Sequence, residues 1–235
     1  MSDKRFEGVL GDEYELFKLA LPYYDELEET IGRAVREHSA GLTASSIVVV
    51  EGGCGTGLTT RQLLQADPRV HVLAIDNEPI MLVQTCDNVK DEWNRIEFRR
   101  RDLLMVLREL QTGSMDVFAS GYLIHNLTPQ YRRDLYAEIS RVLKPGGLFV
   151  NGDKCVRDDP VSQVEDYRMT IAAYDIYDTI GRSDYKAEWI EHYEEDELVR
   201  FTEAEQRGLL SANGFSDVRL VKRFGMDSVM TAMKA

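Results

Sequence analysis

The chain has 235 residues, 43% of them hydrophobic, which predicts one domain spanning 1–235 that can bury a sizeable core. Its formal net charge of -13 opposes nonspecific attraction to nucleic acid and to anionic membranes, so neither is an expected partner. The three cysteines form no CxxC pair and no apolar run could cross a bilayer, which predicts a cytoplasmic protein with no disulfide framework and no metal site.

The first predicted elements are a helix and a buried strand. Leu27, Ile31 and Val35 recur on one face of an amphipathic helix over 22–39, which belongs to a predicted N-terminal helical lid over about 1–40. A β-branched strand over 47–51 follows, and it ends in Glu51 directly before a glycine-rich turn.

Strands and helices alternate after this turn. Further strands are predicted over 71–76, 96–99, 115–119 and 148–151, and a helix over 129–143 ends at a Lys-Pro-Gly-Gly turn. This alternation predicts an α/β fold with a doubly wound, mostly parallel seven-stranded sheet and helices on both faces. A helical insertion over about 156–198 and an antiparallel hairpin of 217–223 and 228–234 complete the predicted domain.

The turn Glu51-Gly-Gly-Cys-Gly-Thr-Gly57 carries the most chemical information. Its alternate glycines allow a sharp bend and the close approach of a ligand to backbone N–H groups. Leu58 and Thr60 stand where a nicotinamide dinucleotide fingerprint needs a small residue, and the lysine of a phosphate loop is absent. The Glu51 carboxylate would repel a pyrophosphate, but it suits a ligand that carries an ammonium group and a sulfonium, which is S-adenosylmethionine.

Five features in this order resemble the class I, Rossmann-like S-adenosylmethionine-dependent methyltransferases. They are the turn over 51–57, Asp76 after the second strand, Asp102 after the third, Ser120-Gly-Tyr-Leu-Ile-His-Asn-Leu127 after the fourth, and Arg141-Val-Leu-Lys-Pro-Gly-Gly147 before the fifth. The resemblance covers about 47–153, and 214–234 resembles the family's terminal hairpin. It implies methyl transfer from S-adenosylmethionine to a small-molecule acceptor, with S-adenosylhomocysteine as the product.

The resemblance also implies the cofactor residues. Glu51 would face the ammonium group, Asp76 would accept hydrogen bonds from both ribose hydroxyls, and Asp102 would bind the adenine amino group. The residues implied around the cofactor are Glu51, Gly52, Gly53, Gly55, Asp76, Asn77, Met81, Asp102, Leu103, Ser120, Gly121 and Tyr24. Asp76 and Asp102 have a second interpretation as caps of the helices that follow them.

The acceptor side is less defined by the sequence. Methyl transfer needs mainly alignment, but an acceptor that must lose a proton also needs a base. His125 is the candidate catalytic residue, with a packed, hydrogen-bonded histidine as the alternative, and His192 is predicted on a solvated acidic face. The aromatic residues of the insertion predict either a lid over a small, partly apolar acceptor or core packing; they are Tyr167, Tyr174, Tyr177, Tyr185, Trp189 and Tyr193. The N-terminal aromatic residues are predicted to close over the cofactor from the other side; they are Tyr14, Phe17, Tyr23 and Tyr24.

Two alternative functions remain open. The stretch over 119–153 and the terminal hairpin also resemble the carboxy-S-adenosylmethionine synthases that supply tRNA wobble-uridine modification. Those enzymes need a cationic residue to hold the added carboxylate, and the acidic segment 188–197 contains no arginine for it. A non-catalytic S-adenosylmethionine-binding protein is the other alternative, since a fold does not fix a function. The sequence is compatible with a homodimer but does not determine the oligomeric state.

Overall fold

The computed structural model describes residues 13–235. The predicted lid over about 1–40 is therefore described from residue 13 onwards, and the side chain of Tyr14 lies outside the described residues. Within this range, no helix is both long enough and apolar enough to cross a membrane.

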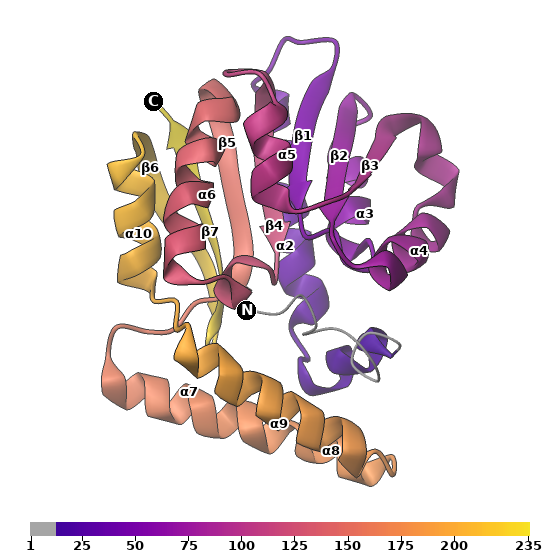
Figure 1. Cartoon of the computed structure of the whole chain (residues 1–235), viewed down its shortest axis with the longest axis vertical. Helices are drawn as coiled ribbons and strands as arrows, with labels where there is room; N and C mark the ends of the chain where they lie inside the picture. The colour runs from indigo at the N-terminus through magenta and orange to yellow at the C-terminus, as the bar shows by residue number, and fades with distance from the viewer. Residues whose placement is uncertain (1–12) are drawn as a thin grey trace.

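Seven strands of the described chain form one sheet in the order β3-β2-β1-β4-β5-β7-β6 (Figure 1). The neighbouring pairs among β1 to β5 are parallel, whereas β7 is antiparallel to both β5 and β6. This arrangement confirms the predicted mostly parallel sheet with a closing hairpin. The strands are β1 (Ile47–Gly52), β2 (Val70–Asp76), β3 (Ile96–Arg100), β4 (Met115–Gly121), β5 (Leu143–Lys154), β6 (Phe215–Phe224) and β7 (Asp227–Lys234).

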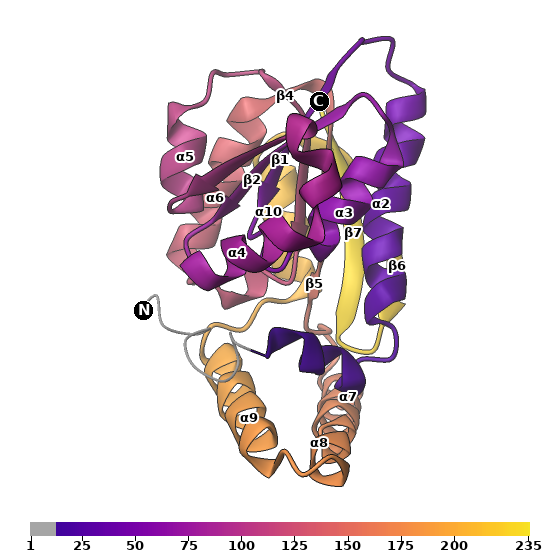
Figure 2. The same ribbon diagram turned by 90° about the vertical axis from the view of Figure 1, so that its right-hand side faces the viewer.

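The central strands are apolar because helices cover both faces of the sheet. Val49 of β1 pairs with Val72 on one side and Val117 on the other, and all three side chains are buried. Helices α2 (Tyr24–Ala40), α3 (Leu58–Ala66) and α4 (Pro79–Asn88) lie on one face. Helices α5 (Leu103–Glu109), α6 (Pro129–Val142) and α10 (Glu203–Ala212) lie on the other (Figure 2).

Several boundaries differ from the sequence prediction, and two of these differences have a clear structural cause. The helix predicted over 22–39 begins at Tyr24, and the short 3-10 helix η1 (Tyr14–Ala20) precedes it. Strand β5 begins at Leu143 rather than at 148, because Leu143 already pairs with Met115 before the register shifts. Gly146, with φ at +76°, makes the intervening bend that the Lys-Pro-Gly-Gly pattern predicts.

The predicted insertion forms a helical layer beyond the carboxyl ends of the parallel strands (Figures 1 and 2). It contains α7 (Pro160–Ala173), α8 (Asp175–Thr179) and α9 (Ser183–Leu198). Phe17 of η1 stacks on Trp189 of α9 with ring centroids 4.1 Å apart, so the N-terminal segment packs against the insertion. Open α/β sheets bind their ligands at this end, and the two segments together enclose it.

Candidate cofactor and acceptor site

The glycine-rich turn after β1 leaves space for a ligand beside its backbone. Gly53, Gly55 and Gly57 adopt left-handed φ angles of +66°, +52° and +86°, and the N–H groups of Gly53 and Cys54 donate to the Ile75 carbonyl. A β-carbon placed on Gly55 would meet no atom of the described chain within 4 Å, whereas one on Gly57 would lie 2.8 Å from Thr85. The turn is therefore closed against α4 and open at Gly55.

Glu51 is a buried carboxylate at the end of β1. Its Oε2 atom accepts a hydrogen bond of 2.7 Å from Thr60 Oγ1, whereas Oε1 has no hydrogen-bond partner among the described residues. Burial raises the pKa of Glu51 to about 8, because the hydrogen bond from Thr60 does not offset the loss of water. A cationic group beside Oε1 would relieve this cost, which is the role predicted for a cofactor ammonium.

Glu28 of α2 is a second buried acid, which the sequence analysis missed. Thr59 Oγ1 donates to Glu28 Oε2 at 2.7 Å, so consecutive threonines of α3 each hold one carboxylate. Burial raises the pKa of Glu28 to about 7, and its negative charge in turn helps to raise the pKa of Glu51. The available signal was its position three residues before Ile31, on the apolar face of the predicted helix.

Asp76 joins the end of β2 to the glycine-rich turn. Its Oδ2 atom accepts from the Gly55 N–H and its Oδ1 atom accepts from the Glu78 N–H, both at 2.9 Å. Each carboxylate oxygen has a further acceptor position, so these bonds leave room for ribose hydroxyls. Of the two residues predicted to flank the adenine, Asn77 is exposed and Met81 is buried on α4.

Asp102 caps α5, as its second interpretation proposed. Its Oδ1 atom accepts from the Met105 N–H at 2.9 Å, and its Oδ2 atom accepts from the Tyr131 hydroxyl at 2.9 Å. Leu103 packs against the glycine-rich turn, because a β-carbon on Gly52 would lie 2.7 Å from Leu103 Cδ2. The structure thus gives Asp102 a structural role, and its contact with adenine stays a prediction.

The segment after β4 lies against α2 and α3. Ser120 is buried, and its Oγ has no hydrogen-bond partner among the described residues. A β-carbon on Gly121 would lie 2.4 Å from Thr59 Oγ1, so α3 needs a glycine here. Tyr122 has a left-handed φ of +51° and stacks on Tyr24 with ring centroids 5.3 Å apart. Such backbone strain in a non-glycine residue is frequent at functional sites.

His125 belongs to the short 3-10 helix η3 (Ile124–Asn126) that follows, and Asp153 of β5 orients it. His125 Nδ1 lies 2.5 Å from Asp153 Oδ1, and the His125 backbone N–H donates to Asp153 Oδ2 at 3.1 Å. The ring is therefore held by its Nδ1 side, and Nε2 is directed toward α9, where it lies 3.6 Å from Asp196 Oδ2.

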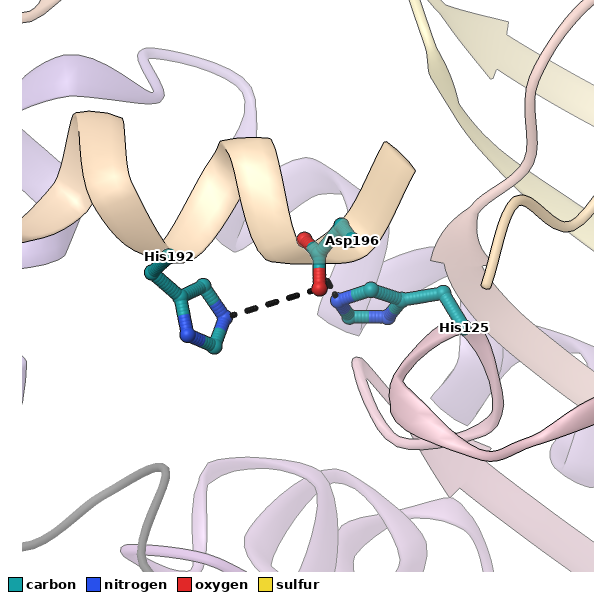
Figure 3. A group of neighbouring side chains, drawn as sticks. All are labelled: His125, His192 and Asp196. Atoms are coloured by element: carbon teal, nitrogen blue, oxygen red, sulfur yellow. Dashed lines mark ion pairs between the residues drawn. The ribbon is translucent and has the colours of Figure 1, made fainter. Parts of the chain in front are cut away.

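The prediction that His192 lies on a solvated face is wrong. His192 is 5% exposed, and it turns inward from α9 toward His125 and Asp196 (Figure 3). The residues of α9 that are buried with it recur at intervals of three or four positions: Tyr185, Trp189, Tyr193 and Asp196. This periodicity places them on one inner face, and the run of glutamates occupies the other face of the same helix.

Asp196 forms the centre of a buried charged group. Lys154 Nζ, at the end of β5, donates to Asp196 Oδ2 at 2.5 Å, and His192 Nε2 lies 3.9 Å from Asp196 Oδ1. Burial opposes ionisation of Asp196, but Lys154 and the two imidazoles outweigh it and hold the pKa of this carboxyl below its ordinary value.

A pocket, here called the lid pocket, lies between the carboxyl end of the sheet and the helical layer. Phe17, Leu21, Tyr122, His125, Lys154, Thr170, Tyr174, Trp189, His192, Met226 and Asp227 line it. Its volume of about 20 Å³ is room for about one water molecule. Tyr174, Tyr177, Tyr185 and Tyr193 are buried around it, as core packing predicts, whereas Tyr167 is 36% exposed.

The sequence matches the methyltransferase domain family over residues 49–147. Along its whole length the chain is 26% identical to carboxy-S-adenosyl-L-methionine synthase of Campylobacter curvus, over 242 residues that cover 100% of both chains. Its structure is similar to an O-methyltransferase family protein from Burkholderia thailandensis, with a TM-score of 0.65, 16% identity, and coverage of 99% of this chain and 62% of that chain. The chain has the domain and the fold of the S-adenosylmethionine-dependent methyltransferases.

A second solved relative of this methyltransferase fold is geranyl diphosphate methyltransferase in complex with S-adenosylmethionine. It shares a TM-score of 0.60 at 13% identity, with coverage of 88% of this chain and 85% of that chain. The domain match over 49–147 contains the glycine-rich turn, Asp76, Asp102 and His125, but it ends before Lys154 and the helical layer. The cofactor side is thus the part shared with the family, and the lid pocket is built largely by segments outside the match.

The residues of this methyltransferase domain fit S-adenosylmethionine. Glu51 Oε1 is buried and has no hydrogen-bond partner within residues 13–235, and Gly55 of the same turn borders open space. A cationic amino group satisfies the first feature, and the backbone of Gly55 can approach a ligand closely. Gly52, Gly53, Ser120 and Gly121 lie at the same ends of β1 and β4, and Tyr24 reaches this region from α2.

Proposed function

We propose that this protein transfers a methyl group from S-adenosylmethionine to a small, partly apolar acceptor that binds in the lid pocket. The observation that carries the proposal is the position of His125, which lines the lid pocket and follows directly on the β4 end of the cofactor site. Bound S-adenosylmethionine supplies an electrophilic methyl group on its sulfonium. The protein's own task is to align the acceptor with that methyl group and to exclude water.

The residues have distinct parts in this proposed reaction. Glu51 and Glu28 would hold the cofactor ammonium, and Asp76 would hold the ribose. Asp153 fixes the His125 ring through Nδ1, so Nε2 would take the proton that an acceptor hydroxyl loses. The stacked Phe17 and Trp189 would shield the transferring methyl group from water when the lid is closed.

Calorimetry and turnover test this proposal in two steps. We expect S-adenosylmethionine and S-adenosylhomocysteine to bind with micromolar affinity, and formation of S-adenosylhomocysteine to depend on an added hydroxyl-bearing acceptor from a panel of small aromatic and aliphatic compounds. Absence of binding for both nucleosides would refute the cofactor assignment. Binding without turnover across the panel would favour the non-catalytic alternative.

A carboxy-S-adenosylmethionine synthase-like activity is the second candidate. Two observations favour it: the similarity to the Campylobacter curvus enzyme extends over the whole chain, and Lys154 lines the lid pocket as a cationic group. Lys154 would supply the positive charge that the acidic segment 188–197 lacks as arginine. Mass spectrometry of nucleosides that co-purify with the protein separates the candidates, because a carboxymethyl sulfonium is heavier than a methyl sulfonium.

The charge and the cysteines of the chain support proposals about its partner and its location in the cell. The net charge of -13 supports a small molecule rather than nucleic acid as the partner. Cys54, Cys86 and Cys155 are free thiols, which supports a cytoplasmic location and is tested by cell fractionation. A homodimer is tested by light scattering of the eluting peak in size-exclusion chromatography.

A further inference from the structure

His125, His192 and Asp196 bring one possible ligand atom each close together beside the lid pocket, and the space between these atoms is here called the common point (Figure 3). The three atoms lie within 4.8 Å of one another, and all three residues are buried. His192 and Asp196 are four residues apart on α9, so they share one face of the helix, and η3 brings His125 against them. Two imidazoles and one carboxylate form a donor set typical of Zn²⁺, Fe²⁺ and related ions.

The surroundings of His125 are those of a metal ligand. Histidines that bind metals usually donate their other ring N–H to a carboxylate, which fixes the ring and strengthens the ligand. Asp153 Oδ1 lies 2.5 Å from His125 Nδ1, so this contact leaves Nε2 for the common point. Both Asp153 oxygens also accept backbone hydrogen bonds, Oδ2 from the His125 N–H and Oδ1 from the Lys154 N–H, so Asp153 serves to hold the His125 ring.

The charge of the pocket gives an independent argument. Asp153, Asp196 and Asp227 are buried carboxylates in or beside the lid pocket, and Lys154 is the lysine that lines it. Buried carboxylates need cationic partners, and Lys154 is the one lysine or arginine among the residues that line the pocket. A divalent cation at the common point would add positive charge beside these carboxylates.

We propose that His125, His192 and Asp196 bind a divalent transition-metal ion in the lid pocket. In a tetrahedral zinc site with bonds of about 2.1 Å, neighbouring ligand atoms lie about 3.4 Å apart. The separations of 3.6 Å from His125 Nε2 and 3.9 Å from His192 Nε2 to the Asp196 oxygens are within side-chain rotation of this value. The ion takes the place beside Asp196 that Lys154 Nζ occupies, so the lysine turns away when the metal binds.

Three protein ligands leave at least one coordination position open toward the pocket. An acceptor oxygen in that position would be oriented by the ion and made more acidic. His125 Nε2 is then a ligand, so the ion replaces it as the group that promotes loss of the acceptor proton. The lid pocket thus binds an oxygen-bearing acceptor through a Lewis acid.

Titration of the metal-free, full-length protein with Co²⁺ tests this site, because Co²⁺ bound to nitrogen and oxygen ligands in a tetrahedral site absorbs visible light strongly. We expect one Co²⁺ per chain, displaced by Zn²⁺. His192→Gln and Asp196→Asn should weaken binding at least tenfold, and Asp153→Asn by about 10–100-fold through the His125 ring. Lys154→Met should tighten binding, because the ammonium group no longer competes for Asp196.

His71→Gln is the matched control, since it removes an exposed imidazole of β2 and should leave the absorption unchanged. Circular dichroism verifies that each variant is folded. If Asp196→Asn does not fold, His192→Gln alone tests the site. A wild-type protein without the visible band, or a His192→Gln variant that binds Co²⁺ as tightly as wild type, would overturn the proposal. The titration needs neither S-adenosylmethionine nor acceptor, so its failure leaves the methyl-transfer proposal standing.

Discussion

Replacement of Glu28 by glutamine should change how the stability of the protein depends on pH. The folded-state pKa of Glu28 is about 7, above its ordinary value of 4.5, because burial disfavours the charged form. The folded protein therefore holds this proton more tightly than the unfolded chain does. The stabilisation is fully present below pH 4.5, and it is lost as the pH rises to about 7.

The magnitude follows from the difference between the two pKa values. A difference of about 2.5 corresponds to about 3 kcal/mol of unfolding free energy. Glutamine keeps an oxygen that accepts the Thr59 hydrogen bond but carries no charge to desolvate. The variant should therefore gain stability relative to wild type as the pH rises. We expect the free energy of unfolding of Glu28→Gln minus that of wild type to be about 3 kcal/mol larger at pH 8 than at pH 4.5. Glu51 is present in both proteins and cancels from this difference to first order.

Urea unfolding of the cofactor-free protein at pH 4.5, 6, 7 and 8 measures this effect. Glu29→Gln is the control, because Glu29 neighbours Glu28 on α2 but is exposed, and its substitution should give a curve parallel to wild type. Parallel curves for Glu28→Gln and wild type would refute the reasoning. In the same variant we expect S-adenosylmethionine to bind about tenfold more weakly, because a charge-assisted hydrogen bond contributes about 1.5–3 kcal/mol.

Three further substitutions probe the site. His125→Gln should lower turnover by about 10²–10⁴-fold for an acceptor that loses a proton, with unchanged calorimetric affinity for S-adenosylmethionine, and equal losses in both would contradict a role at the acceptor. Asp102→Ala should cost about 1–2 kcal/mol in urea unfolding, because it removes the cap at Met105 and the partner of Tyr131, and full stability would argue against the capping role. Trp189→Ala should raise the acceptor KM in steady-state kinetics and leave cofactor affinity unchanged, since its ring stacks in the lid; a selective loss of cofactor affinity would place it elsewhere.

The strand and the glycine-rich turn that follows it could be predicted from the sequence because their signals are local. The β-branched run, Glu51 and the alternating glycines occupy one short segment, and their conformational demands follow from the residue types themselves. Asp76 was recognised because it ends a strand of the same sheet, and parallel strands bring their carboxyl ends together. The alternation of strands and helices and the closing hairpin were also predicted from local patterns, and the structure confirms both.

The acceptor half depends on contacts between distant segments. The glutamates around His192 predicted a solvated helix, and only the packing of α9 over the sheet shows that His192 faces inward toward His125. Lys154 and Asp196 are 42 residues apart, and their ion pair has no signature in either segment. In the sequence Glu28 resembles any acid of an amphipathic helix, and only the folded structure places Thr59 against it. The sequence by itself determined the sheet and the glycine-rich turn after β1, because these follow from local conformation and strand order. The tertiary structure alone decided which charged groups share the lid pocket, because burial is a property of the packed helices and not of the residues.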